Sequence, residues 1–206
     1  MPAQPGKQKQ AIKKRQRERE KHRHVGPSRP SAALIANQVA MLPHGPSYVS
    51  ASFADTRSEL PQLVMVLLTR QTPDGLLFPA VALVDRTCLG VKSGYLGPPL
   101  ARPRLLAFLD RLGSTHPGGL VTCERLVAQS IVYHALDYAA SLGFAPDPDF
   151  PEVLFGPRPE VLLDTPLARP ERPYFVDGPD DDVNAILEQL DRAVGPGNYD
   201  MMVRAA

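Results

Sequence analysis

A chain of 206 residues with a mass of 22.5 kDa and 43% hydrophobic residues is long enough for one globular domain with a sizeable core. Its formal net charge of +1 conceals a basic N-terminal segment followed by an acidic remainder. No apolar run approaches the roughly 18 residues of a membrane span, and the charged N-terminus lacks the apolar segment of a secretion signal. We therefore expect a cytoplasmic protein without membrane partners.

The first 30 residues are predicted to form a flexible basic arm and linker. Residues 1–24 carry a net charge of +7, whereas the rest of the chain carries −6. The arm has almost no apolar side chains, so a helix there would bury nothing and would be disordered when alone. Its candidate nucleic-acid-binding residues are Lys7, Lys9, Lys13, Lys14, Arg15, Arg17, Arg19, Lys21 and Arg23. A solvated tail without specific contacts is the alternative.

From residue 31 to 61 the sequence predicts one short helix and an irregular connection. Ser31 is predicted to cap an apolar helix that runs to Leu42 and is ended by Pro43. Residues 45–61 are mostly small and polar. We expect no more than one short element in them, around Ser58.

A β-hairpin and a loop are predicted next. The apolar runs Leu63–Thr69 and Leu76–Asp85 flank Pro-Asp-Gly at 73–75, which is typical of a turn between antiparallel strands. Pro79 inside the second run predicts a bulge or an edge strand. Residues 89–99 contain three glycines and are predicted to form a loop. Both runs are too apolar to face water, so helices should cover the sheet.

The C-terminal half is predicted to contain three helices and a proline-rich stretch. One helix is predicted between Pro103 and Gly113, and a long, largely buried helix between Thr122 and Leu142. Residues 144–173 are proline-rich and irregular, with a short helix or turn at 152–155. The last expected elements are a strand at Tyr174–Val176 and a helix that follows the carboxylates of Asp180–Asp182 and ends near Val194. Residues 31–206 therefore predict a single α+β domain with a small, hairpin-based sheet covered by helices.

Two weak catalytic candidates lie at the end of the hairpin. Asp85 ends a buried strand, a position at which sheets display functional carboxylates, although a turn residue is the commoner role. Lys92 is the lysine of the glycine loop LGVKSGYLG, which could place an ammonium group and backbone N–H groups around an anion. The loop matches neither the Walker nor the dinucleotide-binding spacing.

His134 and Asp137 are three residues apart on the predicted long helix, so they share a face and could form an acid–base pair or half of a metal site. Asp147 and Asp149 are the nearest candidates for further ligands. Cys123 would lie in the first turn of that helix, where the helix dipole lowers a thiol pKa. Structural roles are commoner for all of these residues, and neither a metal nor a cofactor is predicted.

The sequence resembles a family of uncharacterised bacterial proteins over roughly residues 60–203. The residues that carry the resemblance are LGVK at 89–92, ALDYAASLGF at 135–144 with DPDF at 147–150, the segment 174–182, and GNYD at 197–200. No activity is established for that family. The resemblance therefore implies a bacterial, cytoplasmic, single-domain protein and no site residue.

Three hypotheses of function remain open. The first is a non-enzymatic protein that its basic arm tethers to RNA, at the ribosome or another ribonucleoprotein. The second is a small enzyme of unknown reaction whose site contains Asp85, Lys92, His134 and Asp137. The third is a protein-interaction module with an incidental tail, whose contact surface is the proline-rich stretch.

Overall fold

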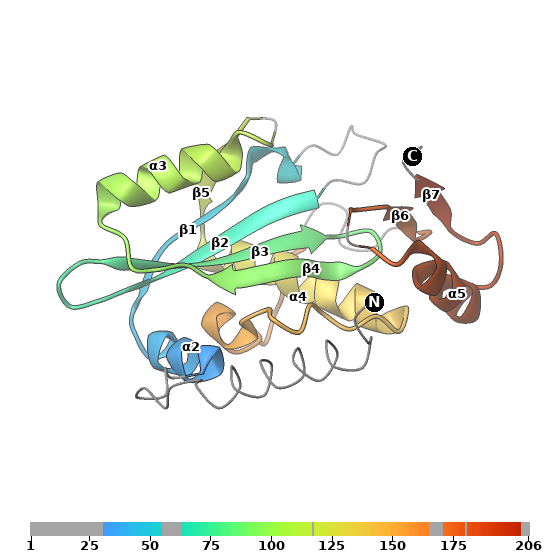
Figure 1. Cartoon of the computed structure of the whole chain (residues 1–206), viewed down its shortest axis with the longest axis horizontal. Coiled ribbons are helices and arrows are strands. Elements are labelled where there is room, and N and C mark those ends of the chain that lie inside the picture. Colours follow the sequence, from blue (N-terminus) through green and yellow to red (C-terminus); the bar gives the residue numbers. More distant parts are fainter. Residues whose placement is uncertain (1–30, 55–62, 117, 165–170, 180, 203–206) are drawn as a thin grey trace, which may run out of the picture. The chain divides into compact units, whose positions relative to one another are not determined.

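The computed structural model describes residues 31–54, 63–116, 118–164, 171–179 and 181–202, and the arm predicted at 1–30 lies outside them. The domain within 33–206 is built on a five-stranded antiparallel sheet with the strand order β4-β3-β2-β1-β5 (Figure 1). The strands are β1 (His44–Ser50), β2 (Leu63–Gln71), β3 (Leu77–Asp85), β4 (Gly90–Leu96) and β5 (Leu120–Cys123). The predicted α+β class, with helices covering a hairpin-based sheet, is confirmed.

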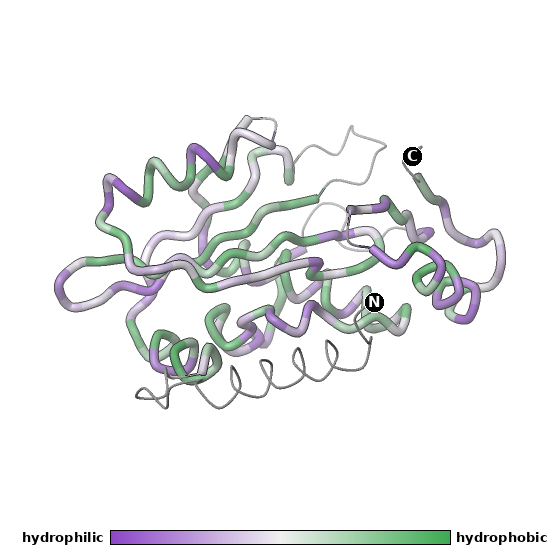
Figure 2. Tube along the Cα trace, in the orientation of Figure 1, coloured by the Kyte–Doolittle hydropathy of each residue, from purple (hydrophilic) through white to green (hydrophobic). Residues whose placement is uncertain are grey.

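Helices cover both faces of the sheet. Helix α3 (Arg102–Gly113) lies on one face, and α4 (Arg125–Ser141) with α2 (Ala32–Ala40) lies on the other (Figure 1). Side chains of β2 alternate between these faces, so that Val66 joins the core under α4 whereas Leu67 packs below α3. Figure 2 shows that β2 and β3 are hydrophobic along most of their length, as strands buried on both faces should be.

The predicted hairpin is confirmed, because β2 and β3 pair from Leu63↔Asp85 to Gln71↔Leu77 without a register shift. Thr72 closes the turn, since its hydroxyl accepts a bond from the N–H of Leu76 (2.9 Å). Gly75 has a φ of +86°, a conformation that only glycine adopts without strain.

Pro79 lies in an interior strand, so the prediction of an edge strand or a bulge at this residue is wrong. It pairs with Thr69 in a regular ladder, and its carbonyl accepts a bond from the N–H of Gly97 (2.7 Å). The N atom of a strand residue points to the same side as its carbonyl. The missing donor of Pro79 therefore faces the β4 side, just beyond Leu96, where β4 ends.

The prediction of an irregular connection after residue 44 is wrong for its first part, because β1 lies between β2 and β5. A register shift between His44 and Ser47 accommodates Pro46, and Thr69 donates its hydroxyl to the Pro46 carbonyl (2.7 Å). Residues 51–54 then form the short helix η1 (Ala51–Ala54), and the element expected around Ser58 lies outside the described residues.

The prediction of a loop at residues 89–99 is also wrong for most of its length, since Gly90–Leu96 is strand β4 at the edge of the sheet. Close packing, rather than the conformation of a loop, requires glycine at position 94. A Cβ atom on Gly94 would lie 2.6 Å from the ring of Phe150 and 3.2 Å from the Val81 carbonyl. The backbone N–H of Asp147 covers part of the free edge by donating to Val91 (3.1 Å).

The long helix begins later than predicted. Residues 120–123 form β5, which pairs with β1 as the other edge strand, and α4 starts at Arg125. The middle of the helix is buried on all sides, as predicted, since every residue from Ala128 to Tyr133 is buried. The predicted helices after Ser31 and at 103–113 are confirmed as α2 and α3.

The C-terminal elements pack against the turn between β3 and β4. Strand β6 (Tyr174–Val176) pairs in parallel with β7 (Asp200–Met202), which was not predicted, and α5 (Val183–Val194) connects them. Asp182 caps α5, since its carboxylate accepts a bond from the N–H of Ala185 (3.1 Å). Phe175 and Leu190 are buried with Cys88 in a core of their own.

The proline-rich stretch contains the short helix η2 (Glu152–Phe155) at the predicted place. Leu154 and Phe155 of η2 are fully buried and join the core below α4 and α2. Among the described residues, no helix has both the length and the apolar character needed to cross a membrane.

Candidate functional site

Asp85, the first predicted catalytic residue, holds the turn that connects β3 to β4. Its carboxylate is buried and accepts bonds from the N–H groups of Thr87 (2.9 Å), Cys88 (3.1 Å) and Leu89 (3.2 Å), and from the Thr87 hydroxyl (3.0 Å). Burial raises the pKa of Asp85, and the bonds from Thr87 and Leu89 oppose this rise. All these donors belong to the turn itself, so the geometry is that of a structural carboxylate.

Lys92 lies close to Asp85 but is engaged elsewhere. Its ammonium group forms an ion pair with Asp181 at 2.5 Å, and both side chains are largely buried. The same carboxylate accepts a bond from the N–H of Gly178 (2.7 Å). Lys92 therefore attaches β4 to the segment before α5. Since β4 is a strand, Lys92 does not belong to an anion-binding loop.

His134 and Asp137 lie on α4, and each has a partner in the proline-rich stretch. A ring nitrogen of His134, Nε2, lies 3.0 Å from the Leu163 carbonyl. Arg158 binds both carboxylate oxygens of Asp137 in a two-pronged ion pair, at the surface. These contacts fix the proline-rich stretch to α4.

The predicted residues thus fall into two pairs, each held by its own structural partners. Asp85 and Lys92 serve the β3–β4 turn and the C-terminal segment, whereas His134 and Asp137 hold residues 158–163. In the part of the chain that the structure describes, no three His, Cys, Asp or Glu residues are grouped to hold a metal ion. Asp147 and Asp149 instead form a local turn, in which the Asp147 carboxylate accepts the N–H of Asp149 (2.8 Å).

Cys123 is not at a helix N-terminus, because it belongs to β5. Burial raises the pKa of its thiol to about 11, the opposite of the lowering that a helix dipole would cause. The thiol is therefore protonated at neutral pH and lacks the reactivity considered for it.

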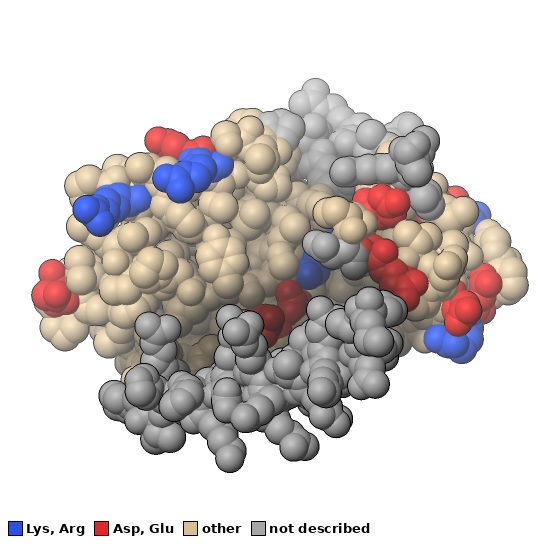
Figure 3. Space-filling model, in the orientation of Figure 1, with Lys and Arg blue, Asp and Glu red and all other residues tan. Residues whose placement is uncertain are grey.

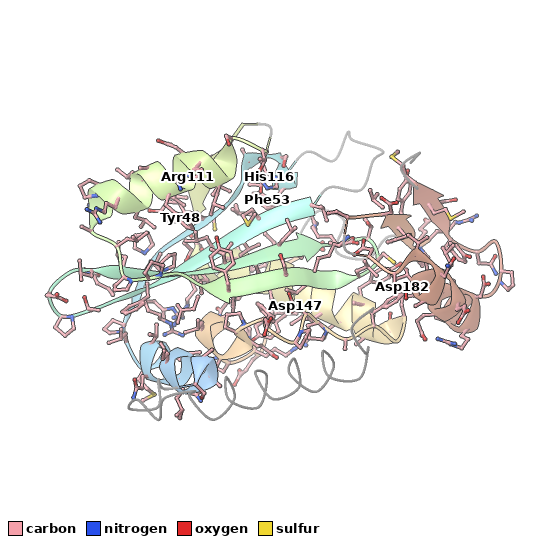
Figure 4. The ribbon with its side chains drawn as sticks, in the orientation of Figure 1. Tyr48, Phe53, Arg111, His116, Asp147 and Asp182 are labelled. Carbon is pink, nitrogen blue, oxygen red and sulfur yellow. The ribbon has the colours of Figure 1, made fainter. Side chains whose placement is uncertain are left out.

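Acidic side chains mark the surface around α5. In Figure 3 they gather over α5 and the segment that leads into it, where Figure 4 labels Asp182. Figure 4 places Asp147 beside the sheet and α4, away from that segment. This distribution fits the net negative charge of the chain after the arm.

A different group of residues, not singled out from the sequence, lies in an unusual electrostatic environment. Arg70, at the end of β2, is only 5% exposed, and its guanidinium donates to the carbonyls of Leu42 (3.1 Å) and Leu154 (3.1 and 3.3 Å). The Leu42 carbonyl follows the end of α2, and the Leu154 carbonyl belongs to η2. These two helices lie side by side in Figure 1. Among the described residues, no carboxylate pairs with this buried charge.

Two further groups join Arg70, and we call His44, Arg70 and Arg125 the cationic cluster. Arg125 is exposed and is the first residue of α4. Burial lowers the pKa of His44 to about 4, and the charges of Arg70 and Arg125 add to this effect. Burial and the neighbouring Arg125 also lower the pKa of Arg70. At neutral pH His44 is therefore uncharged, and the positive charge of the cluster is that of Arg70 and of Arg125, which stands at the N-terminal, positive end of α4.

The geometry around Gly156 shows how closely these side chains converge. A Cβ atom on Gly156 would lie 3.2 Å from Gln129 Nε2, 3.7 Å from Arg70 Nη2 and 3.9 Å from the His44 ring. The Nδ1 atom of His44 is buried and has no hydrogen-bond partner. Gly156 also has a φ of +83°, so this close approach depends on glycine.

The His44 environment predicts a loss of stability in acid. The unfolded chain protonates His44 near pH 6.5, whereas the folded chain resists protonation until about pH 4. Its contribution to the free energy of unfolding is complete above pH 6.5 and falls as the pH decreases toward 4. Chemical denaturation of the wild type and of His44→Gln between pH 7 and 4 should show a shallower decline in the variant.

His116→Gln serves as the comparison, because burial lowers the pKa of His116 as well, and it lies outside the cationic cluster. Its effect should be independent of the His44 effect, so the two should add in the double variant. Parallel pH profiles for the wild type and His44→Gln would contradict the assigned environment.

The sequence contains one weak sign of the cationic cluster. Arg70 directly follows an apolar run in which seven residues, Leu63–Thr69, carry no charge. A charged residue at the end of such a run is ordinary when it is exposed. Arg70 is buried because of the positions of α2 and η2. Its acceptors there, the carbonyls of Leu42 and Leu154, are 28 and 84 residues away in the sequence.

Comparisons with known proteins identify no relative of the chain. No protein-family model matches it, and no curated protein or solved structure matches it significantly. The resemblance to a bacterial family therefore stays a prediction, and the functional argument rests on the residues themselves.

Proposed function

We propose that the protein is a non-enzymatic RNA-binding protein, tethered to RNA or to a ribonucleoprotein by its basic arm. The observation that carries the proposal is the separation of charge along the chain, with +7 in residues 1–24 and −6 in the remainder. Lysine and arginine side chains that neutralise phosphates release counterions, which supplies affinity without sequence recognition. Such arms commonly fold when they bind RNA.

The acidic remainder supports a division of labour. The surface in Figure 3 carries many carboxylates around α5, and these repel a polyanion. Affinity would therefore be concentrated in the arm, while the folded domain restricts how the complex can be oriented. The structural partners of Asp85, Lys92, His134 and Asp137 favour this proposal over the small enzyme, because each of these groups already has a local role.

The test is co-sedimentation of the full chain, and of a form lacking residues 1–30, with ribosomes and with free RNA across a salt series. We expect binding by the full chain that weakens steeply with salt, and little binding by the truncated form. Retention on ribosomes at salt concentrations that release free RNA would indicate a ribosomal site. Equal binding by both forms, or no binding by either, would reject the proposal.

A charge-matched pair of variants sharpens the test. Replacing Lys7, Lys9, Lys13, Lys14 and Lys21 by glutamine removes five charges, whereas replacing them by arginine keeps them. If all five contact phosphates, the glutamine variant should lose about 3.5 units of the slope of log K against log salt, at about 0.7 per contact. The arginine variant should keep the slope.

A further inference from the structure

Positive charge in the cationic cluster is not balanced by any acidic partner among the described residues. Arg70 is buried and bonded only to carbonyl groups, and Arg125 stands at the end of α4 where a cation is least favourable. Burying the Arg70 charge costs free energy, and so does placing the Arg125 charge at the N-terminus of a helix. Their proximity adds like-charge repulsion, which a bound anion would remove.

Unused donors remain at this position. A guanidinium has five N–H groups, and the three bonds of Arg70 leave two of them free. Gln129 uses one amide N–H on the Phe155 carbonyl (2.6 Å) and keeps the other. Both groups lie beside Gly156, where an added Cβ atom would be 3.2 Å from Gln129 Nε2 and 3.7 Å from Arg70 Nη2.

We propose that the cationic cluster binds a phosphate group, with Arg125 at the entrance and Arg70, His44 and Gln129 as the inner contacts. A tetrahedral oxyanion accepts bonds from several directions, which matches donors that come from β1, β2 and α4. Arg125 is exposed and His44 and Gly156 are half-buried, whereas Arg70 and Gln129 are buried, so the proposed site runs from the surface at Arg125 to buried inner contacts. The phosphate can belong to an RNA backbone or to a small molecule.

Nuclear magnetic resonance of the full chain tests the site directly, with inorganic phosphate titrated at constant ionic strength. The amide signal of Gly156 and the ring signals of His44 should shift and saturate. Arg125→Gln should weaken this binding at least tenfold. Arg102→Gln is the matched control, because Arg102 is likewise the exposed first residue of a helix, α3, and should leave the affinity unchanged.

The two sources of phosphate give different results with a short RNA. If RNA occupies the site, the RNA shifts Gly156 and inorganic phosphate competes with it. If the natural ligand is a small molecule, inorganic phosphate shifts Gly156 but RNA bound by the arm does not. Either pattern supports the site. Because the site lies in the folded domain and not in the arm, it can bind phosphate even if co-sedimentation rejects arm-dependent RNA binding.

The proposal would be overturned by the absence of a saturable shift with phosphate, by shifts spread evenly over exposed arginines, or by equal affinities for the wild type and Arg125→Gln. Because Arg125 is exposed, its replacement should not unfold the domain. A shift of Gly156 that sodium chloride reproduces at the same ionic strength would likewise count against a site for phosphate.

Discussion

Replacement of Asp85 by alanine should lower the free energy of unfolding by at least about 3 kcal/mol. The change leaves three buried N–H groups, those of Thr87, Cys88 and Leu89, without their acceptor. A buried donor that loses its partner costs about 1–3 kcal/mol. Equilibrium unfolding in urea, followed by circular dichroism, measures the loss.

Two comparisons show whether the carboxylate acts through these bonds. Asp85→Asn keeps one acceptor oxygen for Thr87 and Cys88 but turns an amide donor toward the N–H of Leu89, so an intermediate loss is expected. Asp147→Ala removes a carboxylate from a similar but exposed turn, where water replaces the bond at little cost. Equal losses for Asp85→Ala and Asp147→Ala would contradict the assigned role.

The second large effect is expected at Gly90, where β4 crosses α4. Gly90 has a φ of +72°, and a Cβ atom there would lie 2.7 Å from the Ala139 Cβ and 3.1 Å from the Ala135 carbonyl. Gly90→Ala should lower the free energy of unfolding by about 3 kcal/mol, as the sum of backbone strain of about 1 kcal/mol and overpacking of about 2 kcal/mol.

Gly75→Ala separates the two contributions. Gly75 has a similar φ of +86°, and no atom lies within 4 Å of the added Cβ, so its loss reports the strain alone. Ala139→Gly should recover part of the stability of Gly90→Ala, because it removes the atom that clashes. Equal losses at Gly75 and Gly90 would show that α4 moves away without cost.

The parts of the fold that could be predicted are those that local sequence determines. The hairpin follows from two apolar runs and a Pro-Asp-Gly turn, and α3 follows from Pro103 and Gly113 with an apolar stripe between them. The cap of α5 by Asp182 is equally local. In each case the deciding residues lie within one element or its ends.

Strands β1, β4 and β5 were missed because tertiary contacts determine them. β1 has the sequence HGPSYVS, which lacks the alternation of a strand. Its Ser50 is buried, and its hydroxyl accepts the N–H of Met65 (2.8 Å). The glycines of β4 indicate a loop until α4 and Phe150 are known to lie against them. Thr122 resembles a helix cap but pairs with Tyr48.

The same distinction applies to the sites. Asp85 was identified as notable from its place at a strand end, and its structural role was the commoner alternative. The cationic cluster could not be predicted, since Arg70 acquires its environment from Leu42 and Leu154. A local sequence pattern does not show whether a segment far away in the sequence will lie against a charged side chain and balance its charge.

The attachment of the C-terminal elements to the β3–β4 turn affects how the protein is made. Thr87 exchanges hydrogen bonds with Tyr174, 87 residues later, and Cys88 is covered by Phe175 and Leu190. All five strands of the sheet have left the ribosome once Cys123 has emerged, but the partners of this turn are synthesised last. A nascent chain stalled before residue 174 therefore carries a complete set of sheet strands and an uncovered apolar end, which is the surface that chaperones and proteases recognise.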